Sequence, residues 1–425
     1  MGIHAGPATA ARALPVRRRD HRIFIMLLAL CVGPSPSARE ITEQEAIAAA
    51  LHRADFRALE ASRRTLAEAD VDAAAQLPNP RASLNREGFT TAGNRTIETS
   101  YEVAQQFDLA GRRGLARDAA ALRLSATEQE TLGERLAAIA DVRKAFGEAL
   151  HRARVVETMD NGLARLASTT GIIEKLAQSG EASGYDRRRV QRELLGTRVR
   201  LATATAELAR SQAELAAWLD FPREEVPQPK GAPLPAPPPA LAYLRASLHA
   251  RPDLTALLRR ADAAAEELRI AQRAWIPEMT IGLGNRVIEE ARGDNDRVML
   301  SLSMPLPVFD RGQPAAKRAA ALREGLRAEH ALRLARLDAT LDGLWRQASQ
   351  LHASALAFRR EGLANSRELT GIARTAYAAG EGGVLELIDA YRSELDTELM
   401  SLDLDYRARI ARIELDQIAG VSPNE

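Results

Sequence analysis

The stretch M-T-I-G-L-G-N-R-V, from Met279 to Val287, alternates apolar residues with polar residues or glycine. Alternation with a period of two predicts a β-strand that has one apolar face. A second alternating stretch, V-M-L-S-L-S-M from Val298 to Met304, follows the polar turn R-G-D-N-D. The two stretches predict an antiparallel pair. Sheets in water also alternate, and strands of about nine to eleven residues equally suit an outer membrane, so the pattern alone leaves both settings open.

A long segment without proline follows this strand pair, from Ala315 to about Ala378. A continuous helix of that length would extend about 95 Å, because each residue adds about 1.5 Å. No ordinary globular core needs such a helix. The glycine-rich break A-A-G-E-G-G-V, from Ala378 to Val384, precedes a second helical pattern. We therefore predict a long antiparallel helical hairpin that turns at Gly380.

The first half of the chain repeats this order of segments at a displacement of about 200 residues, the signature of an internal duplication. Leu77-Pro78 corresponds to Ile276-Pro277, and Ser179-Gly180-Glu181 corresponds to Ala379-Gly380-Glu381. A proline-rich stretch between the copies is best interpreted as an extended linker. The predicted divisions are a signal peptide over 1–38, a first structural repeat over 39–221, the linker over 222–239 and a second repeat over 240–425.

Each copy begins with an Ala-rich helical segment, over 43–75 and 240–274, which ends against a proline. In the first copy, Ile97 to Ala104 alternates clearly, whereas Ala82 to Phe89 alternates poorly. The long helix is expected from Leu115 to about Gln178, with its turn at Gly180. The next helix carries a heptad seam of apolar and small residues: Val190, Leu194, Thr197, Leu201, Ala204, Leu208, Ser211, Leu215 and Trp218.

The N-terminus has the pattern of a cleaved secretory signal. Four arginines, the last of them Arg22, precede the apolar run from Ile23 to Val32, and a stretch of small residues and prolines ends at Ala38. A retained anchor is disfavoured because ten apolar residues are far fewer than the ~20 that span a bilayer. Lipid attachment at Cys31 is also disfavoured, because Leu30 stands where such sites have Gly or Ala.

Composition narrows the class of protein further. The 425 residues include 58 Lys and Arg against 57 Asp and Glu, so the balanced charge argues against nucleic-acid binding. Only 4% are aromatic, and Ala and Leu fill volume instead, which favours long, narrow helices. Four strands cannot close a barrel, because the thinnest closed barrels have about eight. The strands therefore form either a small sheet in water or one part of a barrel shared among several copies.

Three motifs resemble those of the TolC-like outer-membrane factors, in the branch that serves heavy-metal efflux of the resistance-nodulation-division type. They are L-P-N-P from Leu77 to Pro80, F-D-L-A-G-R-R from Phe107 to Arg113, and P-L-P-V-F-D-R-G-Q from Pro305 to Gln313. The third differs from the branch by having Gly312 in place of Asn, and glycine suits a turn from strand to helix. The resemblance covers roughly residues 40 to 422.

The resemblance implies a mainly α fold with a membrane β-barrel portion. Three protomers would each give four strands to one barrel in outer-membrane lipid, and helical hairpins would continue it into the periplasm. The implied partners are a periplasmic adaptor (membrane fusion) protein and an inner-membrane pump of the resistance-nodulation-division type. The implied cargo is heavy-metal cations. A channel for drugs or small organic molecules, and a periplasmic coiled-coil adaptor, are the alternatives.

No catalytic pattern stands out, and we expect neither an enzyme nor a cofactor. Five histidines follow the signal, scattered singly along helices with no cysteine beside them, so we predict no metal site: His52, His151, His249, His330 and His352. The sequence G-R-R-G from Gly111 to Gly114 is weak support for phosphate binding. A turn between barrel and tunnel explains it better.

The resemblance also implies two functional sites. The glycine-centred tips of the hairpins would dock the adaptor, through Gly180, Glu181, Gly380, Glu381 and Gly382. An acidic gate would lie just inside the periplasmic mouth, formed by Glu386, Asp389 and Asp186, with Arg189 in the place that corresponds to Asp389. The plainer alternatives are that the glycines only permit a turn and that the acids form a solvated helix face.

Overall fold

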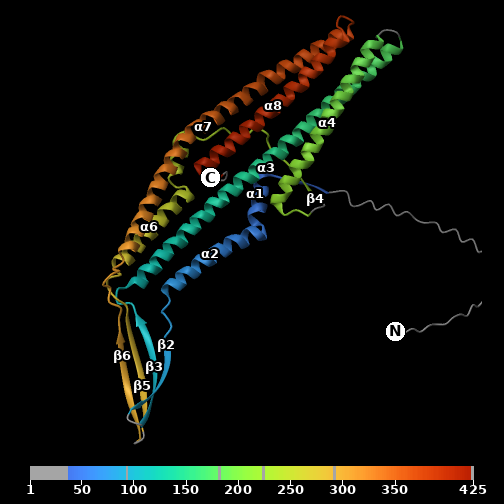
Figure 1. Ribbon diagram of the computed structural model, residues 1–425. Helices are drawn as coiled ribbons and strands as arrows, with labels where there is room; N and C mark the ends of the chain where they lie inside the picture. Colours follow the sequence, from blue (N-terminus) through green and yellow to red (C-terminus); the bar gives the residue numbers. More distant parts are fainter. Residues whose placement is uncertain (1–36, 92–93, 180–182, 223–224, 291–292, 423–425) are drawn as a thin grey trace, which may run out of the picture.

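The protein is an elongated molecule with a β-sheet at one end and two helical hairpin tips at the other (Figure 1). The computed structural model describes residues 37–91, 94–179, 183–222, 225–290 and 293–422. Among these residues, none of the helices combines the length and the apolar character that crossing a membrane requires.

The order of elements is the same in the two halves, as the duplication predicts. The first half contains α1 (Glu43–His52), α2 (Ala54–Ala75), β2 (Arg81–Thr91), β3 (Asn94–Phe107), α3 (Arg112–Gln178) and α4 (Gly184–Leu219). The second contains α5 (Leu241–Leu248), α6 (Pro252–Gln272), β5 (Met279–Glu290), β6 (Gly293–Ser303), α7 (Gln313–Ala378) and α8 (Val384–Ala419). The continuous helices α3 and α7 have 67 and 66 residues, which confirms the two long helices.

The prediction of one helix over 43–75 and one over 240–274 is wrong, because each segment forms two helices. In the second half, Pro252 excludes Arg251 from the helical region of backbone space, and α6 starts there. In the first half, Arg53 is extended at ψ 138° without any proline to mark it. The break turns α1 across α3 and α4, where Ala46, Ile47 and Ala50 are buried.

The four long strands form one antiparallel sheet in the order β2-β3-β5-β6. Its poorly alternating member, β2, pairs along its whole length with β3. Residues that are direct partners share a face. One face is apolar through Ala82, Val103, Leu283 and Leu300, and the other, which we call the polar face, carries Ser83, Glu102, Gly284 and Met299 in the neighbouring row. β2 and β6 are the edges of this sheet.

A second, two-stranded sheet includes part of the proline-rich linker. β1 (Ser37–Ile41) runs parallel to β4 (Glu225–Pro229), which lies within the stretch predicted to be extended. Prolines are tolerated in β4 because a strand with one neighbour needs few of its N–H groups. Just beyond β4, the Lys230 N–H donates to the Ile41 carbonyl at 2.8 Å.

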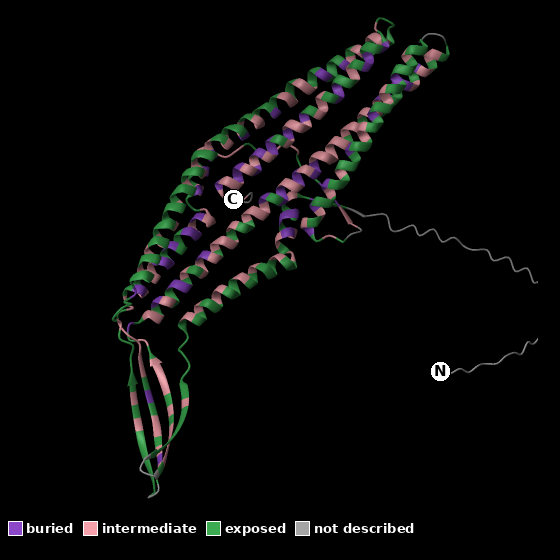
Figure 2. Ribbon diagram, viewed as in Figure 1, coloured by how far each residue is buried: buried purple, intermediate pink, exposed green. Residues whose placement is uncertain are grey.

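Buried residues recur along the helices of both hairpins (Figure 2). In α4, Val190, Thr197, Ala204 and Ser211 are buried at seven-residue intervals, which confirms the heptad seam and its small residues. Charged groups join the two halves at mid-height. Arg143 of α3 donates to Glu43 of α1 at 2.8 Å and to Asp416 of α8 at 2.9 Å.

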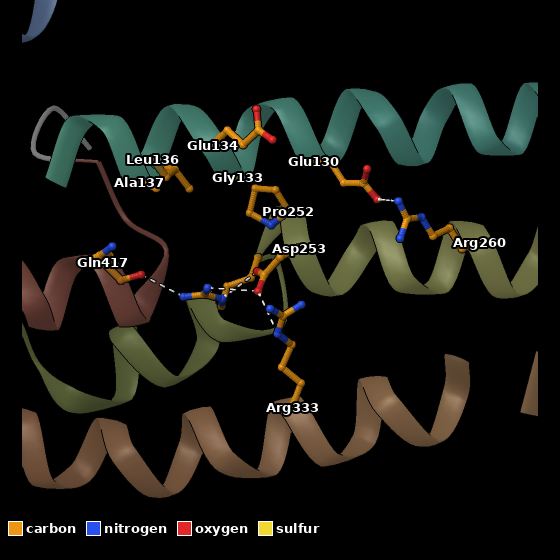
Figure 3. Close-up of a pocket in the computed structure, with 11 residues that line it drawn as sticks. Glu130, Gly133, Glu134, Leu136, Ala137, Pro252, Asp253, Arg260, Arg333 and Gln417 are labelled. Carbon is orange, nitrogen blue, oxygen red and sulfur yellow. Dashed lines mark hydrogen bonds and ion pairs between the residues drawn. The ribbon is translucent and has the colours of Figure 1, made fainter. Parts of the chain in front are cut away.

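A hollow of about 430 Å³ lies beside the junction of α5 and α6 (Figure 3). Residues of α3, of α7 and of the end of α8 complete its lining. The charged side chains that line this hollow form ion pairs. Arg251 pairs with Asp253 at 2.9 Å and donates to the Gln417 carbonyl at 2.8 Å, while Arg333 approaches the same carboxylate at 3.6 Å. We therefore assign this hollow a structural role rather than a ligand-binding one, because its charged side chains are neutralised by their ion-pair partners.

Candidate functional site

The tip of the second hairpin is a tight glycine turn. Gly380 has φ +74°, in the left-handed region that favours glycine, and its N–H donates to the Tyr377 carbonyl at 3.1 Å. Glu381 is exposed, and its N–H and that of Gly382 donate to the Ala376 carbonyl at 3.0 and 3.1 Å. The corresponding residues of the first tip, Gly180 and Glu181, lie outside the described residues.

Both acidic residues at the start of α8 are exposed. Glu386 and Asp389 lie one turn apart, while Leu387 and Ile388 between them are buried. Leu385, which precedes Glu386, is 44% exposed. Glu386 accepts a hydrogen bond from the Gly383 N–H at 3.1 Å, which closes the first turn of α8. Its carboxylate therefore bends back towards the helix end, whereas no such bond holds Asp389 within the described residues.

Asp186 occupies the same place at the start of α4 and makes a different bond. Its backbone N–H donates to the Ser183 hydroxyl at 3.0 Å, and that hydroxyl donates to the Asp186 carboxylate at 2.6 Å. Both carboxylates thus stabilise helix N-termini, where negative charge is favourable. The structure places Asp186 on the other hairpin, near Tyr377. Burial and the Asp186 charge raise the pKa of Tyr377.

A small apolar cluster joins the two hairpins close to their tips. Ile173 of α3, Val190 of α4 and Val384 and Ile388 of α8 are buried together, with Tyr377 of α7 packed against them. The sequence patterns do not reveal this cluster, because each of its residues also fits the seam of its own hairpin.

Ion pairs connect the hairpins below this cluster. Arg392 and Glu193 approach to 2.9 Å, and Arg200 and Asp396 to 3.3 Å, both between α4 and α8. Arg165 of α3 pairs with Glu398 of α8 at 2.8 Å. Sequence reasoning missed all three, since partners in different hairpins leave no fixed spacing along the chain.

A groove of about 880 Å³ runs between α3, α7 and α8 near the tips. Its lining combines three arginines and two tyrosines with Glu394 and with small and apolar residues: Arg165, Arg367, Arg374, Tyr377 and Tyr391 are the arginines and tyrosines. The arrangement can therefore present a charged, partly apolar surface to a helical partner.

The histidines do not converge. His151 stacks on Tyr406, with ring centroids 4.8 Å apart, and burial and the charge of Arg152 lower its pKa. In the part of the chain that the structure describes, no three His, Cys, Asp or Glu residues cluster in a way that could hold a metal ion.

Comparisons with known proteins find a matching family profile, curated relatives and a similar solved structure. The profile of the family described as outer membrane efflux protein matches residues 243–421. The chain is 25% identical over 358 residues to the cobalt-zinc-cadmium resistance protein CzcC of Cupriavidus metallidurans, covering 83% of this chain and 84% of that relative. It is 26% identical over 386 residues to outer membrane protein OprJ of Pseudomonas aeruginosa, covering 80% and 75%. A crystal structure of CusC superposes with a TM-score of 0.72 at 18% identity, covering 89% of this chain and 92% of that one.

Proposed function

We propose that the protein is the outer-membrane channel of a tripartite efflux system, because residues 243–421 match the profile of the outer membrane efflux protein family and the described chain has the TolC-like fold. The strands would lie in the outer membrane and the hairpins in the periplasm. The chain would act as a conduit rather than as an enzyme.

The observation that carries this proposal is the incomplete packing of one protomer. α6 packs against α3 and α7 and buries Leu254, Leu257 and Ala261 among others, whereas none of the residues of α2 is buried. The sheet likewise ends in two unpaired edges, β2 and β6. Unpaired strands are unstable in lipid, since no water satisfies their N–H and C=O groups. Three copies would close twelve strands into one barrel and give each α2 a second neighbour.

We propose heavy-metal cations as the cargo, supported by the likeness to a cobalt-zinc-cadmium resistance protein over most of the chain. The pump would select the cation, because the described residues offer no convergent ligands for it. Replacing His151 or His352 with Ala should then leave resistance and trimer amount unchanged. Loss of resistance at a normal trimer level would contradict transit without coordination.

We further propose that the two tips dock the adaptor. The turn between α7 and α8, which contains Gly380, Glu381 and Gly382, lies at the end of the molecule most distant from the strands (Figure 1). Tyr377 and Ala378, just before this turn, line the groove. A bulky residue at Gly380 should abolish efflux and cross-linking to the adaptor without loss of trimer. The matched control is the same change at Gly196, which lies on an exposed face of α4 with open space around it.

Deletion of the gene, followed by complementation with the intact gene, tests the whole proposal. Washed outer membranes should contain the protein as a heat-sensitive trimer, and the deletion should sensitise cells to divalent metal ions. A soluble periplasmic monomer would refute the channel. Sensitivity to organic compounds alone would refute the metal cargo while leaving the channel in place.

A further inference from the structure

Two charged side chains stand unmatched on the open edges of the sheet. Glu87 lies on β2 and Arg297 on β6, both exposed and both on the polar face that carries Glu102. Within the described residues, neither belongs to an ion pair. Inside the protomer each faces a like charge instead, because Glu87 is the direct partner of Glu98, and Arg297 is the direct partner of Arg286. Like charges directly opposite one another destabilise a sheet.

One ion pair already crosses the centre of this sheet. Arg286 of β5 approaches Glu98 of β3 to 3.4 Å. The two are diagonal neighbours, since the direct partner of Glu98 is Ile288, two residues along β5. The pair spans the boundary between the repeats within this sheet, that between β3 and β5.

The duplication relates this boundary to the open edges. Leu84 pairs with Tyr101 in the first repeat and Leu283 pairs with Leu300 in the second, so the strands superimpose at a displacement of 283 − 84 = 300 − 101 = 199. At the same displacement, Arg286 corresponds to Glu87, and Arg297 corresponds to Glu98. The charges on the open edges are therefore those of the internal pair, with their signs exchanged.

We propose that β6 of one copy pairs antiparallel with β2 of the next, in the register of β3 with β5, and that Arg297 forms an ion pair with the partner's Glu87. Inside one protomer, Val103 pairs with Leu283, and the corresponding pair between copies is Leu302 with the partner's Leu84. In the same way, the pair of Glu102 with Gly284 corresponds to Ser301 with the partner's Asn85. This register rests on the trimer of the proposed function and specifies how its copies join.

The pairing resolves both like-charge contacts. Around the closed barrel, the polar face would carry Glu87, Glu98, Arg286 and Arg297 in turn, three times over. Each pair of acids would then have arginines on both sides. The occupant of the open edges is thus a second copy of this chain, selected by charge as well as by strand edges.

Cysteine cross-linking tests the register. In the variant Asn85→Cys, Ser301→Cys, the two sites of one chain are separated by β3 and β5, about 14 Å at the usual strand spacing, so a disulfide must join different chains. Oxidation of whole cells should give covalent dimers and trimers. The control Asn85→Cys, Ser303→Cys shifts one site by two residues, about 7 Å, beyond disulfide reach. Stronger cross-linking in the control would overturn the register.

Charge exchange tests the ion pair. Arg297→Glu or Glu87→Arg alone should lower the amount of assembled trimer about tenfold, since three junctions each lose an attraction and gain a repulsion. The internal contact that each change improves is present in the monomer and in the trimer alike. The double variant should recover to within about twofold of the unmodified protein. Asp296→Arg, one residue away on the opposite face of β6, should have little effect.

The outcomes separate this inference from the proposed function. If the unmodified protein forms no trimer in the outer membrane, the function itself fails. If it does, but the double variant is no better than the single variants and the cysteines link in another register, only the pairing of Arg297 with the partner's Glu87 fails.

Discussion

The two repeats share an order of elements but differ in how much of each is buried. α6 is enclosed between α3 and α7, while α2, its counterpart, has no buried residue (Figure 2). The strands show the same difference, since β5 has two neighbours and β2 has one. Within one protomer, a helix or strand is buried when it lies at the boundary between the two repeats, as α6 and β5 do. In the proposed trimer, the exposed surface of the first repeat would be contact surface between protomers.

The largest effect should come from the contacts that join the repeats. Asp416 is 2% exposed and binds Arg143 and Arg412, at 2.9 and 2.8 Å. Replacing Asp416 with Ala leaves the buried Arg143 with Glu43 as its one carboxylate partner and removes the carboxylate partner of Arg412, so the free energy of unfolding should fall by about 3 kcal/mol. Asp342 pairs with Arg245 within the second repeat, but both side chains are over one-third exposed. Its replacement with Ala should cost about 0.5 kcal/mol.

Denaturant unfolding of the purified trimer measures both changes. Equal losses for Asp416→Ala and Asp342→Ala would mean that the junction between repeats is no more important than a surface pair.

The turns from strand to helix provide a second contrast, with smaller effects. Gly312 precedes α7 at φ +87°, and a Cβ there would overlap the Ala271 carbonyl oxygen and lie 2.7 Å from the Ala274 Cβ. Gly111 precedes α3 at φ +64°, where a Cβ would only approach the Arg273 guanidinium at 3.4 Å. Asn adopts positive φ more readily than most residues, so a change from Gly to Asn adds little backbone strain. Its effect therefore reports mainly the steric overlap of the new side chain. Gly312→Asn should lower the free energy of unfolding by about 2 kcal/mol, and Gly111→Asn by less than about 1 kcal/mol.

Thermal melting by circular dichroism would detect the difference between these two turns. A milder effect at Gly312 than at Gly111 would show that α6 moves aside easily. The glycine at this motif position, where the efflux branch usually has Asn, is therefore a requirement of the packing against α6.

A third contrast concerns the aspartates of these turns. Burial raises the pKa of Asp108, but hydrogen bonds from the Arg113 and Ala110 N–H groups and the Arg112 charge outweigh it, and the pKa is lowered from its ordinary value of 3.8. Stabilisation by this carboxylate is thus complete above about pH 5 and is lost as pH falls through the folded-state pKa.

Asp108→Asn should therefore cost about 1 kcal/mol at pH 7 and progressively less below pH 4. Asp310, which accepts one bond from the Gly312 N–H at 2.8 Å, provides the matched variant Asp310→Asn, with a smaller cost. Melting curves between pH 3 and 7 measure both, and a loss at Asp108 that does not depend on pH would contradict a role for its charge.

Periodicity predicted the long helices, three of the four strands of the main sheet and the small residues of the α4 seam, because each of these follows from neighbours along one element. It missed the break at Arg53 and the pairing of β1 with β4, which depend on contacts between distant segments. The proposed tip glycines were found by their spacing. The ion pair of Arg392 with Glu193 was not, since its partners lie on different hairpins.

The smallest effect should arise at the starts of α4 and α8, where the repeats differ in charge. The second repeat has Glu386 and Asp389, and the first has Asp186 and Arg189. If a trimer gathers Glu386 and Asp389 in a ring, their repulsion favours bound cations. Glu386 also closes the α8 turn, so Gln, which can accept the same bond, is the conservative replacement.

In planar-bilayer recordings, Glu386→Gln with Asp389→Asn should weaken block by trivalent cations about threefold, a modest loss because these exposed charges are screened by salt. Arg189→Asp copies the second repeat into the first and should strengthen the block by a similar factor if Asp186 also faces the pore. A threefold change in only the first variant would assign the gate to the second repeat alone. Recordings unchanged in both would show that the acids form a solvated helix face and that their contribution is confined to the helix ends.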